Sequence, residues 1–490
     1  MTSDSPVPYS RLTLIAGAAC ALALAGCVHV PLDTSKARAP DFARAGHAAI
    51  LDLGVDAWPA ERWWQDYRDP QLARLIDSAL AGNPTLAVLD ARVRSAGALL
   101  QAEQAAGGVQ ANLETGMNRQ RYSSNGFFPA PIGGSWYTDT TVQGRIGYDI
   151  DWWGKHRAQV AAAIGETNAV RAQASQAQQA LAASVAQSYF RLQMLWARSD
   201  NVAAQAAVER ALLADRNARL QHGLATVDAQ RGVELELGKL AEQAALLETQ
   251  AAREREALRA LVAAGPDAFT LERRLPQTVQ SALPRRLGIE LLARRPDLQA
   301  ARWRVEASLG RVAASEAAFY PDLNLSGAVG LNAVSLARLL RGASRTMLAG
   351  AVLDLPLFDS GRLDASLGIA RAERDALLAE YNEAVLNAVR DVALEAASLQ
   401  GIEHELRAHE GAALASAQLA ASAEARLKRG LTDRSALLQA QVEVLRQRGA
   451  ALQLQDAQLQ TQVALIKALG GGYRAPAQQI AGAPATTQQH

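Results

Sequence analysis

Strict alternation of apolar and polar residues identifies one segment of the chain as an amphipathic β-strand. Between residues 141 and 152, apolar side chains fall on every second position. One set is Val142, Gly144, Ile146, Tyr148, Ile150 and Trp152, and the intervening set is Thr141, Gln143, Arg145, Gly147, Asp149 and Asp151. Successive side chains of a strand point to opposite faces, so this segment has one apolar and one polar face.

Three further segments predict strands. The second alternating segment has Leu323, Leu325, Val329 and Leu331 between Asp322, Asn324, Ser326 and Ala328, and a third run ends at Leu353, Leu355 and Leu357. Residues 110–119 alternate less clearly. We therefore expect four strands, joined in pairs by loops around residues 123–135 and 332–345.

Helical periodicity replaces this alternation over most of the remaining chain. It extends over residues 84–106 and 296–318, each stretch beginning at a proline. Prolines are missing from residues 132–265 and 357–475, and proline inside a helix costs about 3 kcal/mol. These stretches therefore predict exceptionally long helices.

Glycines divide each proline-free stretch into a longer and a shorter helix. Gly223 and Gly430 are the natural interruptions, and they leave long helices near 155–222 and 360–429. With a rise of about 1.5 Å per residue, each is a rod on the order of 100 Å long. Leucine, valine and isoleucine recur every seventh position, at Leu378, Val385, Val392, Leu399 and Leu406, and at Leu438, Leu445, Leu452, Leu459 and Ile466. This spacing predicts antiparallel coiled-coil packing, with a narrow seam because companion positions such as Ala388 and Gly449 are small or polar.

The chain is duplicated at a spacing of about 210 residues. The first copy contains Asn83-Pro84-Thr85-Leu86 and Arg219-Leu220-Gln221-His222-Gly223-Leu224, and the second contains Arg295-Pro296-Asp297-Leu298 and Arg426-Leu427-Lys428-Arg429-Gly430-Leu431. We divide the sequence into residues 1–26 (signal peptide), 27–66 (lipidated extension), 67–271 (first repeat), 272–285 (linker), 286–472 (second repeat) and 473–490 (flexible tail).

Composition and charge argue against a nucleic-acid partner. The 490 residues include 50 basic and 49 acidic residues, for a net charge of +1, and no strongly basic stretch stands out. Hydrophobic residues make up 49% and aromatic residues only 5%, and much of the apolar content is alanine. Thin, closely packed layers are therefore expected rather than thick cores.

Both cysteines lie in the N-terminal region, where residues 12–25 form an apolar run. At about 14 residues this run suits the hydrophobic region of a signal peptide and is short for a membrane span. Leu24-Ala25-Gly26-Cys27 resembles the lipobox of bacterial lipoproteins, which implies cleavage before Cys27 and acylation of its thiol. Val28 replaces the aspartate that would retain such a protein in the inner membrane, so the resemblance implies the outer membrane.

Four amphipathic strands cannot close a membrane barrel, because the smallest barrels have eight strands. Other copies of the chain must supply the rest, since an open edge in lipid leaves backbone groups unsatisfied. Aromatic residues at the strand ends fit the interface girdle of such a barrel: Trp136, Tyr137, Trp152 and Trp153. The alternative is a periplasmic coiled-coil adaptor whose strands form a small capping domain.

Several motifs together resemble the outer-membrane efflux proteins, the TolC-like family, in its NodT-type lipoprotein branch. They are Trp58-Pro59, Trp63-Trp64, Asp69-Pro70, Asn83-Pro84, Asp151-Trp152-Trp153-Gly154-Lys155, Arg294-Arg295-Pro296-Asp297, Ala317-Ala318-Phe319-Tyr320-Pro321, Phe358-Asp359-Ser360-Gly361-Arg362 and Ala468-Leu469-Gly470-Gly471-Gly472-Tyr473. The resemblance implies a mainly helical homotrimer with a twelve-stranded outer-membrane β-barrel and a coiled-coil tunnel through the periplasm. It also implies a periplasmic adaptor (membrane fusion protein) and an inner-membrane RND-type transporter as partners, with this chain a passive exit duct for drugs or other toxic small molecules.

In that family, the turns between paired helices form a periplasmic gate. Here the turns are residues 219–230 and 426–439, and the candidate gate residues are Arg219, Gly223, Asp228, Arg426, Lys428, Arg429, Gly430, Asp433, Arg434 and Gln439. Gln439 stands where the family often has aspartate, which argues against an acidic selectivity ring there. We expect Asp228 and Asp433 to latch the tip with the nearby basic residues, and neutralisation of Arg426 and Arg429 to raise conductance.

The sequence offers little support for an enzyme. No HExxH, CxxC, phosphate-binding glycine loop or recognisable Ser/His/Asp arrangement occurs, so we expect no catalytic residue, metal or cofactor. A channel for type I protein secretion uses the same tube and remains an alternative to small-molecule efflux.

Overall fold

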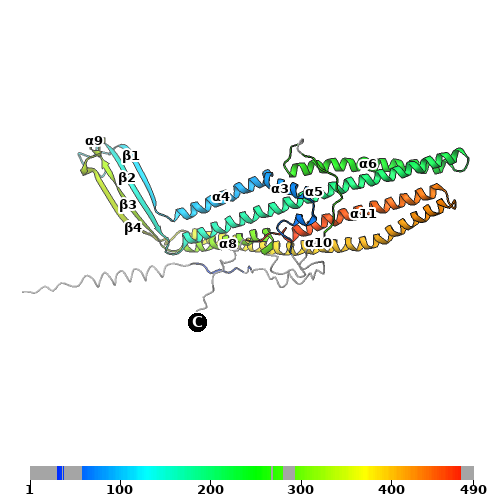
Figure 1. Ribbon diagram of the computed structural model, residues 1–490. Helices are drawn as coiled ribbons and strands as arrows, with labels where there is room; N and C mark the ends of the chain where they lie inside the picture. Colours follow the sequence, from blue (N-terminus) through cyan, green and yellow to red (C-terminus); the bar gives the residue numbers. More distant parts are fainter. Residues whose placement is uncertain (1–29, 36, 38–57, 266–268, 280–292, 476–490) are drawn as a thin grey trace, which may run out of the picture. The chain divides into compact units, whose positions relative to one another are not determined.

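The computed structural model describes residues 30–35, 37, 58–265, 269–279 and 293–475. The same order of elements occurs twice: a helix, two strands, a very long helix and a shorter helix (Figure 1). The first set is α4 (Pro84–Ala106), β1 (Gln110–Arg121), β2 (Trp136–Ile150), α5 (Lys155–Gln221) and α6 (Val227–Leu261). The second is α8 (Pro296–Ala317), β3 (Asp322–Ala333), β4 (Arg345–Asp354), α10 (Arg362–Lys428) and α11 (Arg434–Ala468). Shorter elements are η2 (Trp63–Tyr67), α3 (Pro70–Gly82), α9 (Leu336–Leu339) and η4 (Gly342–Ser344).

The two helices that follow the strands have equal lengths in the two sets. Both α5 and α10 contain 67 residues, and both α6 and α11 contain 35. Among the helices of the described ranges, none combines the length and the apolar character that a membrane span requires. The ten heptad positions are buried or half-buried, which confirms the predicted seams.

The four strands form one antiparallel sheet in the order β1-β2-β3-β4. Its register brings the apolar positions of neighbouring strands onto one face, the predicted sets of β2 and β3 among them: Leu113, Met117, Val142, Ile146, Tyr148, Ile150, Leu323, Leu325, Val329, Leu331, Met347 and Leu353. The other face is mainly polar, although β4 places Leu348 and Val352 there. This pairing confirms the alternation in the sequence, because a slip of one residue would mix the faces.

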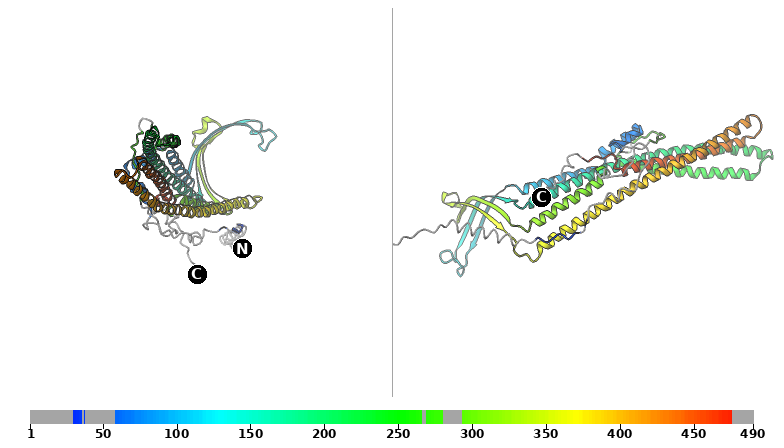
Figure 2. Two further views of the ribbon diagram at one scale, coloured as in Figure 1. Left: turned by 90° about the vertical axis from the view of Figure 1, so that its right-hand side faces the viewer. Right: turned by 90° about the horizontal axis from the view of Figure 1, so that it is seen from below.

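The sheet is strongly curved (Figure 2). Gly330 lies on the polar face, where a Cβ atom would come within 2.5 Å of the Cβ atom of Gln143 and would also collide with the carbonyl oxygen of Val142. Side chains crowd together on the concave side of a bent sheet, so the polar face is the concave one at this point. Glycine permits the close approach of β2 and β3.

Some predicted boundaries were wrong. β2 ends at Ile150, so Trp152 lies beyond the strand, and β4 ends at Asp354, before Leu355 and Leu357. Asp151 explains the first difference, because its carboxylate accepts hydrogen bonds from the backbone N–H groups of His156 and Arg157 and thereby caps the start of α5. Because Asp151 turns toward α5 to make these bonds, the strand stops before it, and Trp152 is no longer part of the alternation.

The described chain forms two compact units, and each combines parts of both repeats. The first unit holds the sheet and the adjoining ends of α4, α5, α8 and α10. In it α5 and α8 cross closely, since a Cβ atom at Gly165 would lie 2.8 Å from the backbone nitrogen of Ala307, and one at Gly310 would lie 2.8 Å from the carbonyl oxygen of Ala158. Small residues therefore determine how near these helices approach.

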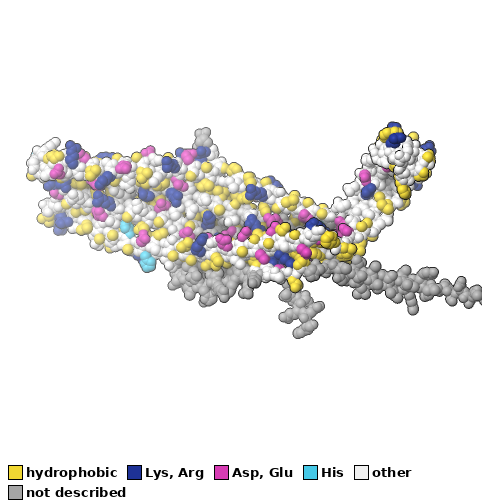
Figure 3. Space-filling view, turned by 180° about the vertical axis from the view of Figure 1, so that it is seen from behind, with side chains coloured by type: hydrophobic (Ala, Val, Ile, Leu, Met, Phe, Trp, Pro, Cys, Tyr) yellow, Lys and Arg dark blue, Asp and Glu magenta, His cyan; other side chains and the backbone are white. Residues whose placement is uncertain are grey.

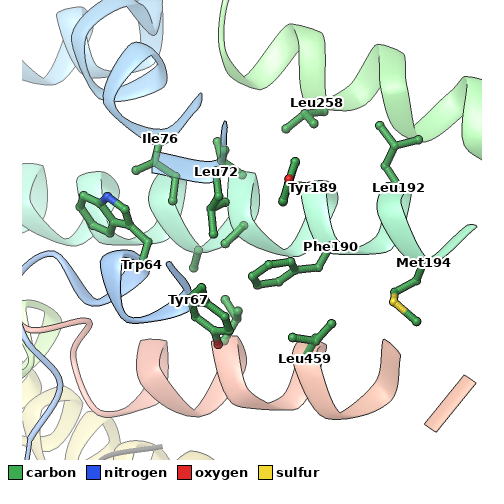
Figure 4. Packing of buried hydrophobic residues seen from close by; sticks show 14 of the residues in the cluster. Trp64, Tyr67, Leu72, Ile76, Tyr189, Phe190, Leu192, Met194, Leu258 and Leu459 are labelled. Atoms are coloured by element: carbon green, nitrogen blue, oxygen red, sulfur yellow. The ribbon is translucent and has the colours of Figure 1, made fainter. Parts of the chain in front are cut away.

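The second unit contains the largest apolar core (Figure 4). Trp63, Trp64 and Tyr67 of η2 pack with helix α3 against Tyr189 and Phe190 of α5, and Leu459 of α11 closes the cluster. Asp69 accepts hydrogen bonds from the backbone N–H groups of Gln71 and Leu72, which starts α3 at Pro70. The tryptophans at 63 and 64 thus belong to the core of this unit.

Candidate functional site

The two hairpin turns of the second unit have the same local structure. Gly223 and Gly430 adopt φ values of +69° and +70°, which glycine reaches without strain. The N–H of the following leucine donates to the carbonyl of Arg219 in one turn and of Arg426 in the other, at 2.8 and 2.9 Å. These are Schellman-type ends of α5 and α10, so both predicted turn glycines are confirmed as helix terminators.

An ion pair joins the two hairpins at their tips. The guanidinium of Arg219, in the last turn of α5, donates to the carboxylate of Asp433, which caps the start of α11. Asp433 also accepts from the hydroxyl of Ser435 and the backbone N–H of Ala436. The hydrogen bond from Arg219 is the main reason that the pKa of Asp433 falls to about 2.

The remaining predicted gate charges are arranged differently from the expectation. Asp433 pairs with Arg219 instead of its neighbours in sequence, and Lys428 pairs with Glu424 over 2.7 Å. No ion pair is found within the described ranges for the other charged candidates, Asp228, Arg426, Arg429 and Arg434. These four and Gln439 are exposed. Partners more than 200 residues apart cannot be matched from sequence spacing, so the pairing of Asp433 with Arg219 could not be assigned from the sequence.

Sequence reasoning missed a second connection between the hairpins. The side-chain amides of Asn201 and Gln205 on α5 both donate to the carbonyl of Leu445 on α11, at 3.0 and 3.3 Å. Gly449, one turn further along α11, leaves room for Asn201, since a Cβ atom there would lie 3.1 Å from its amide nitrogen. Asn201 is buried although it is polar, and because burial is known only from the folded chain, the sequence carried no signal for this contact.

The sheet of the first unit offers a polar wall and two free edges. On the polar face Arg145 pairs with Glu114 over 2.8 Å, and Gln143 donates to the same carboxylate over 3.0 Å. Within the described sheet, β1 and β4 each have a strand neighbour on one side only. Unpaired edges expose backbone donors and acceptors, so this sheet is incomplete as it stands in one chain.

The four predicted interface aromatics have different surroundings. Trp136 is exposed on the apolar face, whereas Tyr137 lies on the polar face opposite Gln120 and donates its hydroxyl to the carbonyl of Pro131. Trp153 stacks on Tyr320, with ring centroids 4.5 Å apart, and Trp152 remains 69% exposed. Neighbouring positions of a strand alternate in direction, so Trp136 and Tyr137 cannot both face the same medium.

A short strap near the N-terminus lies against α10. Asp33 binds Arg374, Ser35 donates to Asp375 over 2.7 Å, and Arg371 donates to the carbonyl of Leu32 over 3.1 Å. The hydrogen bond from Arg374 is the main cause of the lowered pKa of Asp33, about 2. Cys27 lies outside the described residues. Among the described residues, no histidine, cysteine and carboxylate groups cluster in a way that could hold a metal ion.

Comparison with known proteins gives consistent matches. The model of the outer membrane efflux protein family matches residues 75–264 and 287–471, in two stretches that follow the duplication. The multidrug resistance outer membrane protein MdtP of Escherichia coli K12 is 37% identical over 480 residues, covering 95% of this chain and 97% of that protein. MdtQ of Escherichia coli O157:H7, with the same description, is 34% identical over 468 residues, covering 92% of this chain and 96% of that protein.

Solved structures resemble this fold as well. The outer membrane protein VceC of Vibrio cholerae superposes with a TM-score of 0.78 at 30% identity, covering 85% of this chain and all of that one. The outer-membrane channel OprN gives a TM-score of 0.79 at 25% identity, covering 91% of this chain and 99% of that one.

Proposed function

Because this chain belongs to the outer membrane efflux protein family, we propose that it is the exit duct for drugs or other toxic small molecules in a tripartite pump. It is an outer-membrane channel of an efflux pump that extends into the periplasm. The observation that carries the proposal is the four-stranded sheet with one apolar face, one polar face and two free edges.

Three copies complete the wall. In the proposed trimer, β4 of one copy pairs with β1 of the next and gives twelve strands, with the apolar face toward lipid and the polar face toward water. The concave polar face at Gly330 supports this orientation. Exposed Trp136 and Trp152 are the aromatic residues placed to contact the interfaces.

The helical hairpins form the periplasmic part of the duct, and their tips form its gate. Arg219 and Asp433 tie the hairpins of one chain together, and the exposed Arg426, Arg429 and Arg434 are available to a second chain or to the adaptor. An inner-membrane RND-type transporter supplies the energy, and this chain provides a passive path. Acylated Cys27 anchors it in the outer membrane, with the strap that begins at Val30 holding the anchor near α10.

Gene deletion with a susceptibility panel tests the proposal. We expect the deletion strain to become more sensitive to several drugs or metals and the wild-type gene to restore resistance. Cys27→Ala should leave conduction by the purified channel unchanged in planar bilayers while reducing the amount that reaches the outer membrane. If the deletion leaves drug susceptibility unchanged, and a protein that the wild-type strain secretes stays inside the deletion strain, the channel would instead serve type I secretion. A purified mature chain that stays monomeric and soluble without detergent would contradict the channel itself.

A further inference from the structure

Three arginines lie at the loop end of the apolar face of the sheet. Arg119 and Arg121 are the last outward positions of β1, in line with Leu113 and Met117. Arg345 begins β4 on the same face, opposite Leu331 and in line with Met347. The opposite end of the sheet leads into the helices that enter the periplasm, so these arginines lie at its outer end.

These guanidinium groups are not neutralised by the protein. Nowhere in the described chain do Arg119, Arg121 or Arg345 form an ion pair, although Arg145 on the polar face of the same sheet is paired with Glu114. Arg119 lies over the ring of Trp136, 5.7 Å from its centroid, and Arg121 donates to the carbonyl of Gly134 over 3.3 Å. Both contacts position the cations and leave most of their donors free.

Exposed apolar side chains occur at the same end of the sheet. Phe127 in the β1–β2 loop is 95% exposed, and Trp136 is 59% exposed. The loop end of the sheet shows dark blue and yellow side chains together (Figure 3). A surface that is cationic and apolar at once suits an anionic amphiphile.

We propose that Arg119, Arg121 and Arg345 bind the phosphate groups of outer-leaflet lipid, with Trp136 positioning Arg119, an assignment that rests on the proposed barrel. An arginine on the lipid-facing side of a barrel costs about 2–4 kcal/mol at the midplane and little near an interface, so the barrel would hold these positions at the headgroup level of the outer leaflet. Guanidinium groups bind phosphate oxygens in a bidentate way. In the proposed trimer, Arg345 of one copy lies beside Arg119 and Arg121 of the next, so each junction collects three cations.

Lipid binding by the purified full-length channel tests this site. The probe is lipid A carrying its phosphates, added to the detergent-solubilised protein and counted by native mass spectrometry. We expect Arg119→Gln/Arg121→Gln to weaken binding by about tenfold or more, because two charge contacts to an anionic headgroup are lost. Dephosphorylated lipid A should bind wild type and this variant equally weakly.

A matched control variant also removes two positive charges, but from the segment between β3 and β4. Arg338→Gln/Arg341→Gln should bind the phosphorylated probe as wild type does. Equal losses in both double variants, or equal binding of the phosphorylated and dephosphorylated probes by wild type, would overturn the proposed site. If the channel proposal itself fails, the purified protein shows no conductance in planar bilayers. Lipid binding and conductance therefore test the two proposals separately.

Discussion

The side-chain amide of Asn201 on α5 donates a hydrogen bond to the backbone carbonyl of Leu445 on α11, over 3.0 Å. This bond joins a helix of the first repeat to a helix of the second, and it lies within the long hairpins away from their tips. Asn201 is buried, so breaking the bond leaves a polar group without water to replace its partner.

Gly449→Val should lower the apparent thermal midpoint of the helical signal by several degrees, corresponding to about 1–3 kcal/mol of overpacking. The new side chain would displace Asn201, because a Cβ atom at position 449 would lie 3.1 Å from the amide nitrogen of Asn201. Circular dichroism of the detergent-solubilised protein measures the change. Gly401→Val on α10 is the matched control, because nothing lies within 4 Å of a Cβ atom there. If both substitutions lower the thermal midpoint equally, the loss comes from the helix propensity of valine and not from contact with Asn201.

Arg219→Gln should raise single-channel conductance in planar bilayers, because it frees the tip of one hairpin from the other. The double substitution Arg426→Gln/Arg429→Gln should raise conductance less, since neither arginine forms an ion pair among the residues described. Arg219→Lys, which keeps the positive charge beside Asp433, should return conductance toward the wild-type value. If Arg219→Gln leaves conductance unchanged, the ion pair is not part of the gate.

The ion pair between Arg219 and Asp433 should not make conductance depend on pH between about 5 and 8. The pKa of Asp433 in the folded protein is about 2, below its ordinary value of 3.8, so the carboxylate stays ionised throughout that range. A lowered pKa stabilises the fold above the ordinary value, and this contribution is lost as pH falls from about 4 toward 2. A pH titration of conductance checks this, with Asp433→Asn as the reference. A transition near neutral pH that disappears in Asp433→Asn would contradict the assignment.

Gly330→Val should prevent assembly of the trimer. Its side chain would meet Gln143 and the backbone of β2, and the sheet would have to open to accept it. Size-exclusion chromatography and native gels of the membrane extract report the loss of trimer. Gly350→Val on β4 is the matched control, because it places the same side chain on the same face with nothing within 4 Å. Full assembly of the Gly330 variant would mean that the curvature does not depend on this contact.

Patterns along the chain were enough to predict the four strands, the long helices, the faces of β2 and β3, and the family. Alternation from Val142 to Ile150, the absence of proline over the long helices, and the turn glycines at 223 and 430 are local signals, because each depends on backbone geometry within a few residues. The motifs that resemble the outer membrane efflux proteins are also contiguous, and a contiguous motif can be recognised before the chain is folded.

Contacts between distant residues became known only from the folded chain. Asp433 pairs with Arg219 rather than with the nearer arginines, Asn201 finds Leu445, and Gly330 makes room for Gln143. Each contact depends on how two elements approach one another, and that approach follows from packing summed over many side chains. A local pattern predicts which face is polar, but the partner across the interface is chosen by the three-dimensional fit of whole helices and strands.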